Sequence, residues 1–94
     1  MIHYHTNWMG PINENWIAKH GTGWSAGRID IWGVPDEPWG VEYSLPPMRT
    51  EDWNDFGDWL DRFCSEELLT FEQIIETYEE NTETKIRWCK EDET

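Results

Sequence analysis

The spacing of the apolar residues changes in the middle of this chain, at Pro46 and Pro47. Before the two prolines, apolar and polar residues alternate in short runs, a period of two that is typical of half-buried strands. After them, apolar residues recur with the period of an amphipathic helix. A chain of 94 residues supports one hydrophobic core. The change of period therefore predicts a single α+β domain in which strands come first and helices second.

Four runs of alternating residues predict strands. They are residues 2–6, 25–32, 39–45 and 84–89. The turn sequence GVPDEP separates the second run from the third, which favours an antiparallel hairpin. In the third run, Trp39, Val41 and Tyr43 are expected to share one face. A short helix is expected at residues 13–20, with an asparagine as its cap and Gly21 at its end.

Two amphipathic helices are expected after the prolines. Thr50 is the expected cap of the first, and Thr70 with Gln73 forms a capping-box pattern at the start of the second. Gly57 lies inside the first helix, where it indicates either close packing or a bend. The apolar faces of the two helices are formed by Trp53, Phe56, Leu60, Phe63, Phe71, Ile74, Ile75 and Tyr78.

These elements predict how the domain is organised. Residues 1–48 form the strand region, which is rich in tryptophan and glycine, and residues 49–82 form an acidic helical pair. Residues 83–90 contain the final strand and residues 91–94 are a tail. We expect a three- to four-stranded, mainly antiparallel sheet with the two helices packed on one of its faces. Eight tryptophans supply large side chains for the core, and Trp53 and Trp88 are assigned to it.

Negative charge is concentrated on the predicted helical pair. Residues 51–80 hold eleven Asp and Glu against one Arg, and the whole chain has a formal net charge of -13. This charge disfavours direct contact with nucleic acid or with an anionic membrane, because both require clustered Lys and Arg. The N-terminal sequence has neither the basic region nor the apolar stretch of a signal peptide, so we expect a cytoplasmic protein.

The density of these acids is close to that of a nucleic acid. One helix of thirty residues would be about 45 Å long and would carry roughly one acid per 4 Å, compared with one phosphate per about 3.4 Å of a DNA strand. We therefore expect the acids to occupy a basic, nucleic-acid-binding site on another protein. Two tryptophans are added as anchors: Trp59, at the edge of its helix's apolar face, and Trp32, on the strand face opposite the isoleucines of its run. The expected partner-binding residues are Glu51, Asp55, Asp58, Asp61, Glu72, Glu76, Glu79, Glu80, Trp59 and Trp32.

The sequence offers little for catalysis or for metal binding. His3, His5, His20, Cys64 and Cys89 do not have the spacing of a zinc site, and the two cysteines are expected to be reduced thiols. No nucleophile elbow, HExxH sequence or glycine-rich phosphate loop occurs. We expect a protein that is not an enzyme and that uses no cofactor and no metal.

The segment GRIDIWGVPDEPWGVEYSLPPMRTEDWNDFGDWLD, residues 27–61, resembles small uncharacterised proteins of tailed bacteriophages and prophages. In size, acidity and lack of catalytic motifs, the chain is similar to phage anti-defence proteins that mimic DNA. The resemblance implies an inhibitor that acts in the cytoplasm of an infected bacterium. Its implied partner is a host or defence-system protein, such as a restriction, CRISPR or nucleic-acid repair complex.

Two other functions are compatible with the sequence. Exposed aromatic side chains could let the chain assemble with copies of itself, with the acids serving only solubility. The tryptophans could instead line a pocket for a small ligand. The sequence leaves the oligomeric state open.

Overall fold

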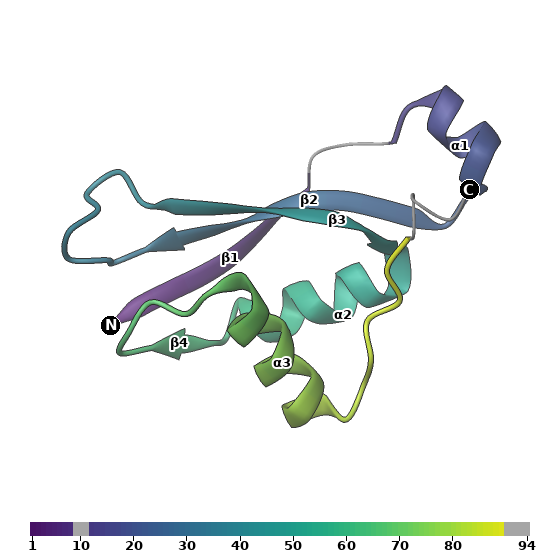
Figure 1. Ribbon diagram of the computed structural model, residues 1–94. Helices are drawn as coiled ribbons and strands as arrows, with labels where there is room; N and C mark the ends of the chain where they lie inside the picture. Colours follow the sequence, from purple (N-terminus) through teal and green to yellow (C-terminus); the bar gives the residue numbers. More distant parts are fainter. Residues whose placement is uncertain (9–11, 90–94) are drawn as a thin grey trace.

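The computed structural model describes residues 1–8 and 12–89. Its elements form one four-stranded antiparallel sheet, in the order β3-β2-β1-β4, together with helices (Figure 1). This arrangement confirms the predicted α+β fold. The elements are β1 (Ile2–Trp8), α1 (Glu14–His20), β2 (Trp24–Trp32), β3 (Val41–Arg49), α2 (Thr50–Leu60), β4 (Cys64–Ser65) and α3 (Phe71–Thr82).

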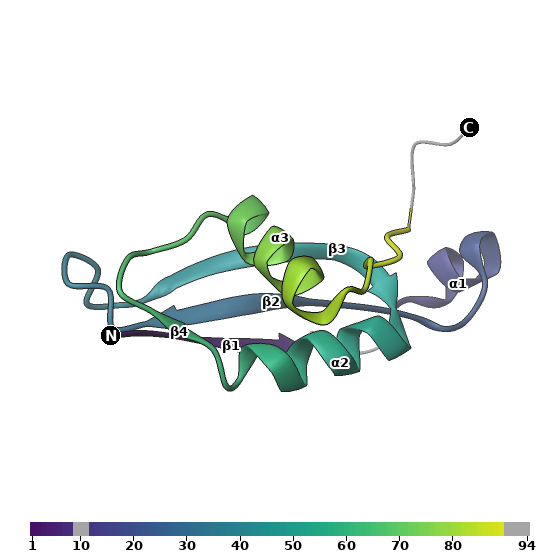
Figure 2. The same ribbon diagram turned by 90° about the horizontal axis from the view of Figure 1, so that it is seen from below.

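Helices α2 and α3 cover the same face of the sheet, as predicted, while α1 lies at one end and the β2–β3 loop projects at the other (Figures 1 and 2). Tyr4 pairs with Ile31 and Thr6 pairs with Ile29, so alternate residues of β1 and β2 point to the helices. The other face of the sheet carries the intervening residues. The buried core consists of Ile2, Tyr4, Ile29, Ile31, Leu45, Met48, Trp53, Phe56, Leu60, Ile74, Ile75, Tyr78 and Ile86.

Close packing explains the glycine inside α2. A Cβ atom on Gly57 would lie 2.8 Å from Thr6 Oγ1 of β1, which is closer than van der Waals contact allows. A Cβ atom on Gly27 of β2 would overlap the ring of Trp53 in the same way. Both glycines therefore let α2 lie directly against the sheet. Of the two readings of Gly57, the structure supports close packing.

The ends of the helices are partly as expected. Asn13 accepts a hydrogen bond from Trp16 N at the start of α1, and Thr70 and Gln73 form the complete capping box of α3. Thr50, however, is the first residue of α2 and not its cap, because β3 runs directly into the helix. Its hydroxyl lies 2.9 Å from that of Ser25, so it links α2 to β2. Helix α2 ends at Leu60, before Phe63.

The prediction of a final strand at residues 84–89 is wrong. This segment forms one isolated bridge, between Trp88 and Met48, and the fourth strand is β4, inside the region assigned to the helical pair. In the segment 84–89, two backbone N–H groups donate to carboxylates and not to a neighbouring strand: Ile86 N donates to Glu79 and Arg87 N donates to Asp52. The segment therefore meets β3 only at its end, where Arg49 N donates to Arg87 O and Cys89 N donates to Pro47 O. The predicted tail at 91–94 lies outside the described residues.

Candidate acidic interface on helices α2 and α3

Helix α2 exposes a stripe of acids opposite its buried face. Glu51, Asp55 and Asp58 follow at i, i+4 and i+7, which places them on one side of the helix, and all three are exposed. Asp61, directly after the helix, is also exposed. The opposite side packs Trp53, Phe56 and other apolar residues into the core. The amphipathic pattern therefore fixes these acids on the outer surface of the domain.

Helix α3 repeats this arrangement. Glu72, Glu76 and Glu80 follow at i, i+4 and i+8 and are exposed, while Glu79 is half-buried. Ile74 and Tyr78 lie on the buried side. The two helices pack on the same face of the sheet (Figure 1), and each carries its acidic stripe on the side away from its buried residues.

Three of the predicted partner-binding acids already have partners within the protein. Glu51 Oε2 lies 3.0 Å from Arg87 Nη2, and Asp61 Oδ1 lies 2.7 Å from His5 Nδ1. Glu79 Oε2 accepts a 3.0 Å hydrogen bond from Ile86 N. Their charge is therefore partly used in holding the fold together.

The remaining five acids make no ion pair or side-chain hydrogen bond to another described residue. We call them the open carboxylates, and they are Asp55, Asp58, Glu72, Glu76 and Glu80. The charge of Asp55 also acts on the core. The pKa of Tyr78 lies above its ordinary value, because burial of its hydroxyl and, next, the negative charge of Asp55 raise it. A surface of like charges that lacks internal counterions favours a cationic partner.

The structure changes the comparison with DNA. Eight of the eleven acids lie on two helices of 11 and 12 residues, which are about 16 and 18 Å long, and the other three lie between the helices. Helix α3 runs obliquely to α2 in both views (Figures 1 and 2). The acids thus cover a compact area made of two short stripes. The expected match to a single extended strand of phosphates is replaced by this two-stripe surface.

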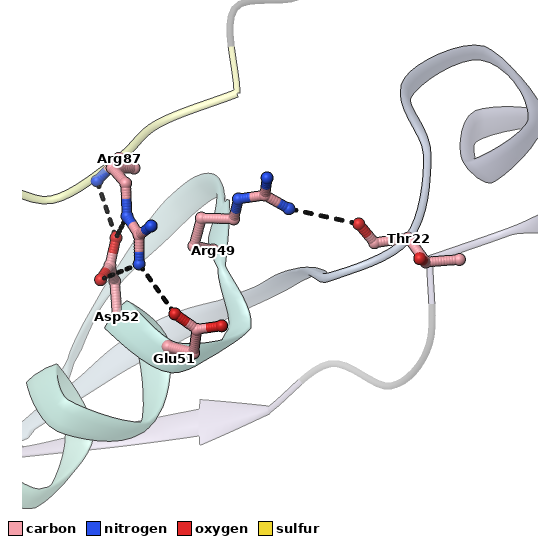
Figure 3. Close-up of polar contacts among 5 residues, drawn as sticks. All are labelled: Thr22, Arg49, Glu51, Asp52 and Arg87. Carbon is pink, nitrogen blue, oxygen red and sulfur yellow. Dashed lines mark hydrogen bonds and ion pairs between the residues drawn. The ribbon is translucent and has the colours of Figure 1, made fainter.

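Asp52 belongs to a different site. It is buried, and Arg87 donates to its carboxylate from the backbone N, Nε and Nη2, at 2.9 to 3.1 Å (Figure 3). Burial would raise the pKa of Asp52, but the hydrogen bonds and charge of Arg87 lower it below its ordinary value. Arg49 lies nearby, donates to Thr22 O and covers the ring of Trp24. This group, the Asp52–Arg87 clamp, ties the C-terminal segment to the start of α2.

The two predicted tryptophan anchors differ in their surroundings. Trp59 is half-buried: its ring stacks on Phe63, with centroids 4.8 Å apart, and meets Tyr78 edge-on. It therefore contributes mainly to the edge of the core, although it also lines a shallow hollow with Asp58 and Arg62. Trp32 is 48% exposed, on the uncovered face of the sheet.

Two exposed tryptophans were not predicted as partner-binding residues. Trp39 is 95% exposed and Trp8 is 57% exposed. The expectation that Trp39 shares a strand face with Val41 is wrong, because β3 begins at Val41. Gly40, with a φ of +85°, turns the chain just before the strand, and its N–H bonds Glu37 O. The position of Trp39 between Pro38 and Gly40 was the sequence signal for a turn residue.

An aromatic groove at the other end of the sheet bears on the small-ligand alternative. Trp8, Trp16 and Trp24 line a groove of about 290 Å³ beside α1, with Ser25 and Thr50 among its polar lining residues. Trp16 and Trp24 meet edge-on, with centroids 6.3 Å apart. No charged side chain lines the groove among the described residues, so the lining supplies no charge with which to bind an ionic ligand.

Two histidines lie beside the two cysteines, in two pairs that belong to different parts of the fold. His3 pairs with Cys64 across β1 and β4, whereas His20 Nδ1 lies 3.7 Å from Cys89 Sγ at the end of α1. Across residues 1–8 and 12–89, no group of three His, Cys, Asp or Glu residues is arranged to hold a metal ion. No helix in this part of the chain is long and apolar enough to cross a bilayer.

Comparisons with known proteins found no relative of this chain. No family model, curated protein or solved structure matches the chain. The functional argument therefore depends on the surface of the molecule itself.

Proposed function

We propose that this protein is a non-enzymatic, phage-type inhibitory binding protein whose acidic helical surface occupies a basic site on another protein. The basic site is one that normally binds nucleic acid, on a host defence or nucleic-acid-handling protein in the bacterial cytoplasm. The observation that carries the proposal is the set of five open carboxylates on two helices packed against one sheet. Because the helices are held by the core, the charges are presented without a large ordering cost on binding.

The distribution of paired acids also supports this function. On the two helices, Glu51 and Glu79 hold internal partners, while the five open carboxylates do not and stay available to a partner. Electrostatic attraction to a basic site predicts fast association that weakens as salt rises.

The test is capture of bacterial proteins on the immobilised chain, eluted with increasing salt. The test variant reverses four open carboxylates, Asp55→Lys, Asp58→Lys, Glu72→Lys and Glu76→Lys. The control variant changes net charge equally but at other exposed acids, Glu14→Lys, Glu66→Lys, Glu67→Lys and Glu83→Lys. We expect wild type and control to capture one nucleic-acid-binding complex that elutes with salt, and the test variant to lose it.

Two results would contradict the proposal. One is equal capture by the test variant and the wild type, with both proteins folded by circular dichroism. The other is equal loss in both variants, since that would make total charge and not the helical surface responsible.

Self-assembly is the second candidate function, and the exposure of Trp8, Trp32 and Trp39 favours it. It predicts a mass in solution that rises with concentration and falls on Trp32→Ala. Trp59→Ala is a poorer probe than expected from sequence, because Trp59 also packs against Phe63 and Tyr78. A mass that stays monomeric at high concentration would remove this candidate.

A further inference from the structure

The β2–β3 hairpin presents the most exposed large apolar side chain among the described residues. Trp39 is 95% exposed and Trp32, at the end of β2, is 48% exposed. Both lie at the end of the sheet where the hairpin projects from the body of the domain (Figure 1). Tryptophan is enriched among the residues that dominate binding energy at interfaces.

The hairpin loop holds Trp39 in a fixed backbone position. Glu37 N donates to Val34 O at 3.1 Å, and Gly40 N donates to Glu37 O at 3.0 Å. Pro38 restricts the backbone immediately before Trp39. Because the backbone is ordered in advance, binding through Trp39 loses little conformational entropy.

Two shallow hollows adjoin these tryptophans. Both are lined by Trp32, Trp39 and Gly40. The larger, of about 260 Å³, also includes Glu37 and Pro38. The smaller, of about 100 Å³, also includes Glu42 and the ion pair of Arg28 with Asp30. Each hollow thus combines indole rings with at least one carboxylate.

The charge around the hollows selects the sign of the ligand. Arg28 is the only cation lining either hollow in the described part of the chain, and its Nε lies 2.9 Å from Asp30 and 3.7 Å from Glu42. Glu37 has no such counterion. This negative charge disfavours phosphate groups and anionic lipids as occupants, and the net charge of -13 opposes a second copy of this chain. A flat cation can contact both an indole face and a carboxylate.

We infer that the hairpin is a second contact for the basic partner and binds an arginine side chain of that protein. The guanidinium group packs on the indole of Trp39 and donates hydrogen bonds to Glu37. Arginine is favoured over lysine because its planar group stacks on aromatic rings and is less strongly hydrated. The inference rests on the proposed function for the basic character of the partner, but it has a separate test.

The test compares the affinity of the intact protein for an arginine peptide and for a lysine peptide of equal length and charge, measured by titration calorimetry. Wild type should bind the arginine peptide about threefold to fivefold more tightly. Trp39→Ala should remove this preference, and Glu37→Gln should reduce it. The matched control is Trp8→Ala. Trp8 is an exposed tryptophan that pairs with Gly27, toward the other end of β2, and its substitution should leave the preference for the arginine peptide unchanged.

The four-site reversal of the open carboxylates separates this inference from the proposed function. This variant should bind both peptides more weakly, by the same factor, and should keep the preference for the arginine peptide. A preference that survives Trp39→Ala, or one that Trp8→Ala removes, overturns the hairpin inference whatever the helices do. If the reversal leaves both affinities unchanged while Trp39→Ala removes the preference, the helical proposal fails and the hairpin contact stands.

Discussion

The helical side and the hairpin end of this molecule use the same residue types in opposite ways. On α2 and α3, aromatic side chains such as Phe56 and Tyr78 are buried while acids face outward. At the hairpin, Trp39 faces outward, and the buried acid Asp30 lies against Arg28 at the base of the loop. Residue type alone therefore does not decide whether a tryptophan or an acid of this protein is buried or exposed. Packing of α2 and α3 on the sheet buries the aromatic residues, whereas Asp30 is buried among side chains of its own sheet, which include Asn7 and Arg28.

The largest effect is expected when an aromatic is removed from the helical side. Phe56 is fully buried and meets Tyr78 edge-on, with centroids 5.1 Å apart. Phe56→Ala should lower the free energy of unfolding by about 3–5 kcal/mol, because it removes apolar contacts and leaves a cavity. Urea denaturation measures this loss. A loss below about 1 kcal/mol would mean that the helices do not pack on the sheet as described.

The second effect contrasts two neighbouring acids of α2. Asp52→Asn should destabilise the fold by about 2 kcal/mol at neutral pH, because it weakens the charged hydrogen bonds to Arg87. Asp55→Asn, in the open stripe, should change stability by less than about 0.5 kcal/mol. Equal effects from the two substitutions would contradict the division between structural and open acids.

The Asp52 contribution should also depend on pH. Since the pKa of Asp52 is lowered in the folded state from its ordinary 3.8, the ionised group stabilises the fold above that value. The contribution is lost as pH falls through the still lower folded pKa. The stability difference between wild type and Asp52→Asn should therefore shrink as the solution is acidified below 3.8, and a difference that stays constant would argue against the clamp.

A smaller effect tests how closely α2 approaches the sheet. Gly57→Ala should destabilise by about 1 kcal/mol although alanine favours helices, because its Cβ atom meets Thr6 Oγ1. In a Thr6→Ala background, which lacks that oxygen, the same substitution should become neutral or stabilising. If Gly57→Ala stabilises the wild-type protein, Gly57 is not a packing residue.

The smallest effect is expected at the hairpin. Trp39→Ala should change the free energy of unfolding by less than about 0.5 kcal/mol, because the side chain is 95% exposed. Comparison with Phe56→Ala then measures the difference between the two regions directly. A loss of several kcal/mol would show that Trp39 packs against the protein and is not presented to a partner.

The sequence predicted the elements that depend on local pattern. The first three strands, the three helices, an asparagine cap on α1 and the capping box of Thr70 and Gln73 all depend on residues close together in the chain, and these were confirmed. The two residues of β4 carry too short a pattern to be recognised. They pair with Ile2 and His3 only because the folded chain brings them there.

Site residues were harder to predict because their state depends on distant partners. Asp52 could have been recognised, since it precedes Phe56 and Leu60 by four and eight positions and so lies on the buried face of α2. Its partner Arg87 is 35 residues away and could not be deduced. The separation of paired from open acids depends on such contacts and required the structure.

The most direct test of the central claim is competition between this protein and DNA for the captured partner. A labelled DNA duplex is bound to the partner, and the wild-type protein is then added in increasing amounts. The proposed function predicts that the duplex is released and that the four-site reversal of the open carboxylates releases little. A stable complex that contains the partner, the duplex and this protein together would contradict occupation of a nucleic-acid-binding site.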